Sequence, residues 1–376
     1  MKKIVHAFLL VMLVSCTVNE AQKNILAKTL FSEAVAATND DTLFCHGRQV
    51  NVNEEIISFA MCGDIMMGTT YPEVRLPAND GKYLFDDTKE ITKRVDVAVG
   101  NLEGVLCNDG TSTKEDGPYS YSFMMPTRFA SLLSDAGYDF LSMANNHAND
   151  FGIEGIASTE QCLDNEGIKY AGIVGRTKGA VIERRDRKIG FCAFGHNGYT
   201  YRHQDKELVK SLLDYLNTQC DIIVVSFHGG AEGKTQSHLP YGTEMFLNED
   251  RGNLREFAHF CIDNGADVVY GHGPHVLRCI EVYNNRFIAY SLGNFCTPHG
   301  INITGISGYA PVIEIKIDKN DGSFKSGIIH SFIQQSGIGP RKDKTNCAAK
   351  EIKRLTIEDI DDSNIVIDNR GYISMQ

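Results

Sequence analysis

The chain has 376 residues, and 48 acidic side chains outnumber 37 Lys and Arg side chains to give a formal net charge of −11. This acidic balance, without a Lys/Arg-rich run, argues against a nucleic-acid partner, because phosphate backbones are bound through basic surfaces. Once an N-terminal targeting region is set aside, the remaining length suits one large α/β domain with insertions.

The first sixteen residues are typical of a bacterial lipoprotein signal peptide. Lys2 and Lys3 precede the apolar stretch 4–14, and the letters LVSC end at Cys16 like a lipobox. The apolar stretch is shorter than the ~18 residues that a membrane-spanning helix needs. An ordinary secretory signal with an incidental cysteine is the alternative. We predict lipidation at Cys16, a tether over 17–53, and an exported protein anchored to the membrane of the bacterial cell envelope.

Five apolar segments have the length and composition of buried β-strands. Their sequences are IISFAMC, VDVAV, FLSMA, IIVVSF and ADVVY, in chain order from residue 56 to residue 270. Helical patterns over 127–137, 205–219 and 253–264 alternate with these strands, which favours βαβ units and a largely parallel sheet.

Two further segments favour antiparallel pairing. Residues 180–195 and 312–331 each alternate around a polar turn, as the strands of a hairpin do. A mixed pair of sheets, packed face to face with helices outside, accommodates both patterns. We expect this α/β domain to cover 54–340 and a C-terminal extension to follow over 341–376.

Each of the five strands runs directly into a short polar cluster. The carboxyl ends of neighbouring strands in an α/β sheet meet at one edge, where ligands bind. Carboxylate, amide and imidazole groups gathered there are the ligands of divalent metal ions. Turns alone also favour Asp, Asn and Gly, but three of the five clusters contain His, which turn chemistry does not explain.

The clusters divide into acids, amides and imidazoles. Asp64 and Glu103 supply carboxylates, and Glu103 is our candidate to bridge two ions. Asn146 offers an amide oxygen, while the adjacent His147 is suited to protonate a leaving group. Three further imidazoles complete the predicted set, at His228, His272 and His275. We read the two glycines after His228 as room for a ligand near the backbone.

Six motifs together resemble the CapA family of bacterial capsule and poly-gamma-glutamate synthesis proteins. In order they are GDIMMG, NLEG, NNHAND-x-G, HGG-x-E, GADVVYGHGPHV and YSLGNF, and they extend over about 56–317. The domain of that family is similar to the calcineurin-like metallophosphoesterase superfamily. The resemblance implies a four-layer α/β/β/α sandwich of two mixed sheets flanked by helices, with a two-metal centre at the strand ends.

Carried over residue by residue, the resemblance supports the same site. It implies metal ligation by Asp64, Glu103, Asn146, His228, His272 and His275, and it puts His147 at the superfamily's catalytic position. Four other motif residues are candidates for substrate binding: Asn101, Asn145, Glu232 and Asn294. The chain departs from the superfamily where Met66 replaces a ligand His and where Gly273 stands in place of another His.

The sequence favours an anchored, metal-dependent hydrolase of capsule or poly-gamma-glutamate-type polymer synthesis or export. Its cofactor would be one or two ions of Mn, Zn, Fe or Mg. Its partners would be an anionic surface polymer or a phosphoester substrate, the membrane, and membrane-bound proteins of polymer synthesis. The alternatives are a non-catalytic module that binds a polyanion during assembly or export, and a purely structural lipoprotein.

Overall fold

The computed structural model describes residues 42–45, 48–51, 55–115, 117 and 120–376. The chain forms two units, residues 1–54 and 55–376. In the first unit, strands β1 (Thr42–Cys45) and β2 (Arg48–Asn51) pair antiparallel. The predicted signal peptide, with Cys16, lies outside the described residues. Among the residues that are described, no helix has the length and apolar character needed to cross a membrane.

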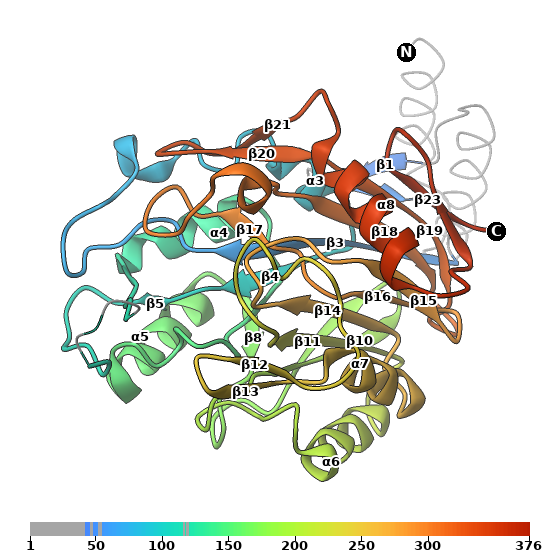
Figure 1. The fold of residues 1–376 in the computed structure, drawn as a ribbon, viewed down its shortest axis with the longest axis horizontal. Coiled ribbons are helices and arrows are strands. Elements are labelled where there is room, and N and C mark those ends of the chain that lie inside the picture. Colours follow the sequence, from blue (N-terminus) through green and yellow to red (C-terminus); the bar gives the residue numbers. More distant parts are fainter. Residues whose placement is uncertain (1–41, 46–47, 52–54, 116, 118–119) are drawn as a thin grey trace, which may run out of the picture. The chain divides into compact units, whose positions relative to one another are not determined.

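The second unit is built on two large mixed sheets (Figure 1). The nine-stranded sheet has the order β22-β23-β19-β18-β3-β4-β7-β8, with β17 paired to β3. Its strands are β3 (Ile56–Ile65), β4 (Val97–Leu102), β7 (Phe140–Ser142), β8 (Lys169–Ala171), β17 (Asn294–Cys296), β18 (Val312–Asp318), β19 (Phe324–His330), β22 (Ile365–Ile367) and β23 (Tyr372–Met375).

The six-stranded sheet has the order β15-β16-β14-β11-β10-β9. Its strands are β9 (Ala180–Arg184), β10 (Arg187–Phe194), β11 (Ile222–His228), β14 (Val268–His272), β15 (Ile280–Tyr283) and β16 (Arg286–Ala289). Three two-stranded pairs complete the unit: β5 (Val105–Leu106) with β6 (Met124–Met125), β12 (Glu244–Phe246) with β13 (Glu249–Gly252), and β20 (Phe332–Gln335) with β21 (Gly339–Lys342).

Parallel and antiparallel pairs occur in both sheets, as predicted. Strands β3, β4, β7 and β8 are parallel, and so are β10, β11, β14 and β16. The two predicted hairpins are confirmed as the antiparallel pairs β9–β10 and β18–β19. In the first hairpin, Arg185 and Asp186 turn the chain with positive φ values of 52° and 60°, the conformation of a tight two-residue hairpin loop.

The core lies on both faces of the sheets because alternate residues of each strand point in opposite directions. Along β3, Phe59 and Met61 enter the core between the sheets, whereas Ala60 and Cys62 enter the core on the other face. A strand that is apolar on both faces must be covered on both, which is why the sheets are sandwiched.

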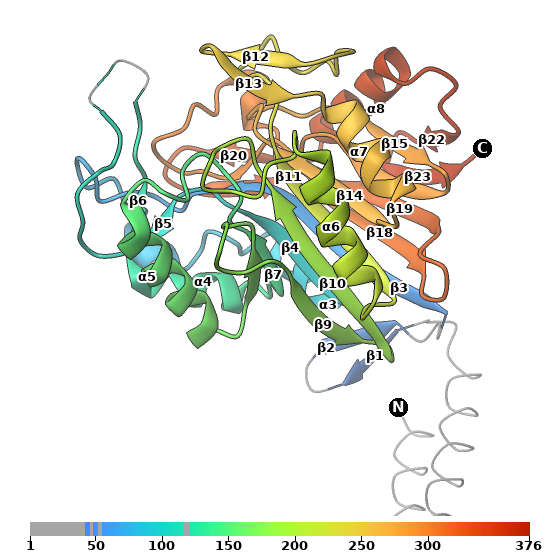
Figure 2. The same cartoon turned by 90° about the horizontal axis from the view of Figure 1, so that it is seen from below.

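Helices cover the two outer faces (Figure 2). Helices α3 (Lys89–Arg94), α4 (Ala130–Asp135) and α5 (Gly152–Asn165) pack on the nine-stranded sheet. Helices α6 (Lys206–Asn217) and α7 (Leu254–Asp263) pack on the six-stranded sheet. Asp205 begins α6 by accepting a hydrogen bond from the Leu208 N–H at 3.0 Å, as an N-cap does. The predicted four-layer α/β/β/α architecture is confirmed.

The second unit continues to the end of the chain. Residues 341–376, which we expected as an extension beyond the domain, form helix α8 (Cys347–Asp359) and strands β22 and β23. Strand β23 pairs with β19 at the edge of the nine-stranded sheet, and Ile352 of α8 is buried in the core between the sheets. These residues therefore belong to the packed unit. In the described part of this unit, 3-10 turns occur at Ala78–Gly81, Thr127–Phe129 and Gly305–Gly308.

Candidate metal centre

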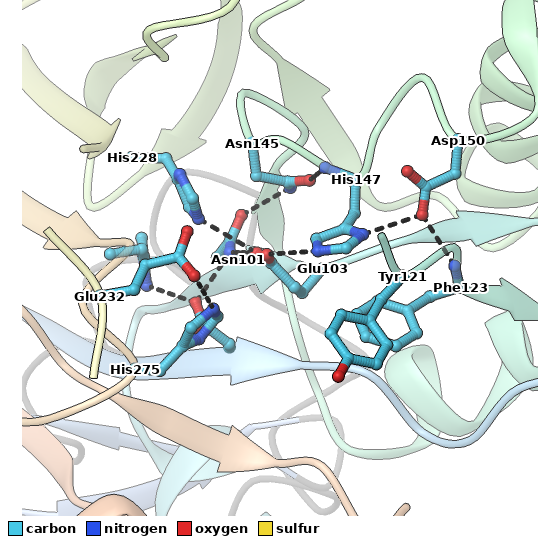
Figure 3. A network of polar contacts seen from close by, with 12 residues as sticks. Asn101, Glu103, Tyr121, Phe123, Asn145, His147, Asp150, His228, Glu232 and His275 are labelled. Atoms are coloured by element: carbon cyan, nitrogen blue, oxygen red, sulfur yellow. Dashed lines mark hydrogen bonds and ion pairs between the residues drawn. The ribbon is translucent and has the colours of Figure 1, made fainter. Parts of the chain in front are cut away.

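The strand ends of the two sheets bring predicted ligands together, among them Glu103, His228 and His275 (Figure 3). Asp64 near the end of β3 is paired in register with Asn101 of β4, and Glu103 follows β4 directly. In the facing sheet, His228 at the end of β11 is paired in register with His272 at the end of β14. Parallel strands thus deliver acids from one sheet and imidazoles from the other to the same edge.

Asp64 is contacted by two imidazoles and one amide. His275 Nδ1 lies 2.9 Å from Asp64 Oδ2, and His272 Nδ1 lies 3.3 Å from Oδ1. Asn101 Nδ2 donates to Asp64 Oδ1 at 2.8 Å. Asp64 and His272 have no exposed surface, whereas the His275 side chain is 18% exposed.

His275 reaches Asp64 from an unusual backbone conformation. Its φ is 58°, in the left-handed region that residues other than Gly adopt rarely. Asn294 Nδ2 donates to the His275 carbonyl at 3.1 Å, which holds that conformation. Strained backbone of this kind concentrates at functional sites, and here it turns the imidazole toward the carboxylate.

Glu103 is the centre of a second cluster. His228 Nε2 lies 3.5 Å from Glu103 Oε2, and His147 Nε2 lies 3.9 Å from Oε1. Asn101 Nδ2 donates to Glu103 Oε2 at 2.5 Å. Since the same amide also donates to Asp64, Asn101 links the two carboxylates. The acids and imidazoles form one continuous buried network.

Electrostatics keep both acids ionised. Burial acts to raise the pKa of Asp64, but the adjacent His272 and His275 imidazoles outweigh it and hold that pKa well below its usual range. Burial likewise opposes ionisation of Glu103, and the attraction of His228 overcomes it, lowering the Glu103 pKa to about 2. Burial lowers the pKa of His275, yet Asp64 raises it to about 10. Two ionised carboxylates in a dry site are suited to a cation.

Unpaired polar atoms supply the test of whether a metal ion fits. Several buried atoms have no hydrogen-bond partner among the described residues: Glu103 Oε1, Asn146 Oδ1, and both ring nitrogens of His228 and of His272. A buried polar group left unpaired costs about 1–3 kcal/mol. Imidazole nitrogens, carboxylates and amide oxygens are ligands of divalent metals, so the donor set fits such an ion.

The side chains are not preassembled around one point. Within the described parts of the chain, no group of three or more His, Cys, Asp or Glu side chains has the spacing of a formed ion site. Both carboxylates instead hydrogen-bond to Asn101, and Asp64 also hydrogen-bonds to His275. The carboxylate, amide and imidazole groups are therefore suitable metal ligands, but a few of these side chains would have to rotate to bind one ion.

His147 is oriented by a buried carboxylate. Its Nδ1 lies 2.8 Å from Asp150 Oδ2 and 3.0 Å from Lys114 Nζ. Asp150 Oδ2 also accepts from the Phe123 N–H at 2.7 Å, and the Phe123 ring lies 4.3 Å from the imidazole. Lys114 Nζ lies 2.7 Å from Asp150 Oδ1. These contacts direct Nε2 toward Glu103, the geometry of a positioned acid or base.

The glycines in the site allow neighbouring segments of the chain to pack closely. A side chain at Gly229 would meet Arg251, His203 and Leu254, and one at Gly230 would meet Leu254 and Arg278. The space that we read as room for a ligand is therefore filled by protein, and that interpretation was wrong. A side chain at Gly273 would come within 2.2 Å of the Gly229 carbonyl oxygen, so the His of some relatives has no place here.

Met66 contributes packing. The Met66 side chain is buried, and its terminal methyl lies close to Gly300: a Cβ atom added to Gly300 would come within 2.8 Å of that methyl. The position that holds a ligand His in the wider superfamily therefore carries an apolar side chain in contact with a neighbouring loop.

The four candidates for substrate binding occupy different places. Asn101, Asn145 and Asn294 are fully buried and hydrogen-bonded to protein groups: Asn145 to Asn101 and the Leu102 carbonyl, Asn294 to three loop carbonyls. Their side chains therefore support the centre from within the protein, and Asn101 donates to both Asp64 and Glu103. Glu232 lines an open cleft together with Asn146 and His147, and it pairs with Arg251 at 2.9 Å.

Three residues of the site were not predicted from sequence. Asp150 was visible in the NNHAND motif, three residues after His147, but we gave it no role. Lys114 and Arg251 come from a loop and from strand β13, without a motif signal. Only the folded chain brings these cations to the cleft.

An α/β/β/α sandwich whose strand ends carry acids, amides and imidazoles defines a metallophosphoesterase-like fold. The family described as bacterial capsule synthesis protein PGA_cap matches residues 58–299, more than half of the chain. The chain belongs to this family.

Two relatives and one solved structure show the extent of the likeness. The PGA biosynthesis protein CapA of Bacillus subtilis (strain 168) is 29% identical over 269 residues, covering 66% of this chain and 65% of that protein. The capsule biosynthesis protein CapA of Bacillus anthracis is 25% identical over 264 residues, covering 65% and 61%. In both cases the match spans less than two thirds of the relative. A novel phosphatase from Mycoplasma pneumoniae superposes with a TM-score of 0.48 at 12% identity, covering 77% of this chain and 95% of that one.

Proposed function

We propose that the chain acts in the synthesis or export of a capsule or poly-gamma-glutamate-type surface polymer, and that its site is a metal-dependent hydrolase. Family membership and the names of the two Bacillus relatives support the polymer role. One observation carries the metal proposal: buried Glu103, His228 and His272 atoms lack hydrogen-bond partners in the described part of the chain.

The residues divide the work in the following way. Asp64, Glu103, Asn146, His228, His272 and His275 would hold one or two divalent ions. When bound, the metal would polarise the scissile phosphoester, acyl or amide group. Asp150 contacts His147 Nδ1 at 2.8 Å, and His147 Nε2 faces Glu103. With both ring nitrogens protonated, His147 would transfer the Nε2 proton to a departing group, which is the general acid step that we propose.

Metal content of the purified protein tests the proposal. Protein prepared without chelator should carry about one or two equivalents of a transition metal, and His228→Ala should lose most of it because His228 has no exposed surface and two unpaired nitrogens in the described structure. His259→Ala is the matched control, since His259 pairs with Glu281 away from the site. Wild-type protein that holds no metal and takes up neither manganese nor zinc would contradict the proposal.

One observation favours a second candidate function, a non-catalytic module that binds a polyanion. Met66 packs where the superfamily has a ligand His, so a metal could be held for binding and not for turnover. Metal-loaded protein should be assayed on a panel of phosphoesters and gamma-glutamyl amides. Binding of metal without turnover of any member would favour the module.

We also propose that the protein is exported and attached to the membrane through lipidated Cys16, with membrane-bound proteins of polymer synthesis as partners. The lipobox-like letters LVSC before and at Cys16 support this proposal.

A further inference from the structure

A cleft of about 550 Å³ opens beside the candidate metal centre. Asn146 and His147 line it where it meets the centre, and Glu232 lines it as well. The β12–β13 hairpin and the loop that precedes β6 contribute most of the other lining residues. A substrate bound at the centre would therefore extend into this cleft. The residues that line the cleft indicate the chemical nature of that part of the substrate.

The charges of the cleft do not suit a repeated anion. Its lining includes two cations, Lys114 and Arg251, and four acids, Glu115, Asp150, Glu232 and Glu249. Both cations are already paired: Lys114 with Asp150 at 2.7 Å, and Arg251 with Glu232 and Glu249 at 2.9 Å each. A surface with an excess of acid repels a polyanion. Positive charge for one oxyanion would come from metal at the centre.

Three neighbouring residues of the lining have large apolar side chains or rings. Tyr121 is 55% exposed and Leu247 is 58% exposed, and both line this cleft together with Phe246. Leu247 adopts a φ of 47° at the turn of the β12–β13 hairpin, a left-handed conformation that is uncommon for a residue with a branched side chain. Aromatic and aliphatic side chains left in water beside a polar centre offer contacts to a ring.

We propose that this cleft binds the ring of a phosphomonoester, with Tyr121 and Leu247 contacting an aromatic or sugar ring while the phosphate faces the metal centre. The proposal rests on the proposed function, because the oxyanion requires a metal-loaded centre. The expected substrates carry a single anionic group on a ring, whereas a polyanionic polymer carries many anionic groups along a chain.

Phosphonates test the proposal because their C–P bond is not hydrolysed. The full-length chain, purified in detergent and loaded with Mn²⁺, is titrated by calorimetry with inorganic phosphate, methylphosphonate and phenylphosphonate. We expect phenylphosphonate to bind at least fivefold more tightly than methylphosphonate. Tyr121→Ala and Leu247→Ser should each reduce that preference at least threefold and leave methylphosphonate binding unchanged. Tyr215→Ala is the matched control, since Tyr215 is 50% exposed on α6 and does not line the cleft.

The outcomes separate the two proposals. Equal binding of the two phosphonates would overturn the ring site and leave the metal centre standing. A preference for phenylphosphonate that survives both substitutions would also overturn the ring site and leave the metal centre standing. Tighter binding of penta-gamma-glutamate than of phenylphosphonate, measured in the same titration, would do the same. If the metal-loaded chain binds none of the three phosphorus compounds, the metal-centre proposal fails and the ring site fails with it.

Discussion

Asn101 is the residue through which the two halves of the candidate centre are joined. Its amide nitrogen donates to Asp64 at 2.8 Å and to Glu103 at 2.5 Å, and its oxygen accepts from Asn145 at 2.9 Å. Two carboxylates this close repel each other unless a donor or a cation lies between them. Asn101 supplies that donor between the two acids, while the neighbouring imidazoles hold both pKa values down.

Neighbouring residues Asn146 and His147 should respond differently to substitution. Asn146→Ala removes a buried amide oxygen that lacks a hydrogen-bond partner in the described structure, so it should lower metal content. His147→Ala should leave the metal in place and reduce turnover by about 10²- to 10⁴-fold, the usual contribution of a general acid. Elemental analysis and steady-state kinetics on the same preparations measure both effects. A loss of turnover well below tenfold for His147→Ala would show that His147 only stabilises its loop.

The candidate ligands were predictable because each is fixed by a local pattern, an apolar strand followed by a polar residue. Asp64 and His228 are of this kind, since the strands that carry them are almost entirely buried and mostly apolar. The contact between Lys114 and Asp150 was not predictable, because Lys114 precedes Asp150 by 36 positions and lies in a loop without periodicity. Contacts that depend on loop closure are decided by the tertiary fold.

At the scale of elements, prediction succeeded where one face of a segment is strongly apolar. Helix α6 buries Val209, Leu212, Leu213 and Leu216 at helical spacing, and it was predicted. Helix α5 was missed because its buried face includes Gly155, Thr159 and Glu160, which weaken the apolar pattern. The buried position of Glu160 is explained by a pair with Arg176, a contact that no local pattern reveals.

The two sheets should depend strongly on the aromatic pair between them. Phe140 of β7 and Phe191 of β10 stack with ring centroids 4.7 Å apart, and neither is exposed. Phe191→Ala should lower the free energy of unfolding by about 3–5 kcal/mol, because it removes buried apolar surface and leaves a cavity. Urea denaturation of the metal-free protein measures the change.

The matched control for the core substitution is Ile357→Ala on α8. Ile357 is 69% exposed, and surface substitutions usually change the free energy of unfolding by less than about 0.5 kcal/mol. A change at Phe191 no larger than the change at Ile357 would mean that the face-to-face sheet packing contributes little to stability.

At the scale of the whole molecule, the proposed attachment to the membrane depends on Cys16. A short apolar stretch alone does not give a stable span, whereas more than one acyl chain gives lasting attachment. Cys16→Ser should therefore release the protein from the membrane fraction or block its processing. Fractionation with immunoblotting measures release, and intact mass of the wild-type protein checks the modification. Cleavage at another site, with no added lipid, would contradict the anchor.

Stability in acid should be limited by a buried imidazole that the proposed chemistry does not use. His203 has almost no exposed surface. Burial, reinforced by the positive charges of His228 and Arg202, lowers the pKa of His203 to about 3. In the unfolded chain its pKa returns to about 6.5. Between these values the unfolded state binds one more proton, so the stability contributed by His203 is present above pH 6.5 and is lost as pH falls.

His203→Gln removes this titration while keeping a side chain of similar polarity. Near pH 5, the free energy of unfolding of the metal-free wild-type protein should rise with pH more steeply than that of the variant, by about 1.4 kcal/mol per pH unit. The comparison cancels titration of the site acids and of His196, whose pKa burial also lowers to about 2. Urea denaturation from pH 4.5 to pH 6.5 measures both slopes. Equal slopes would mean that His203 becomes protonated within the folded protein, and that water or an anion reaches it behind His228.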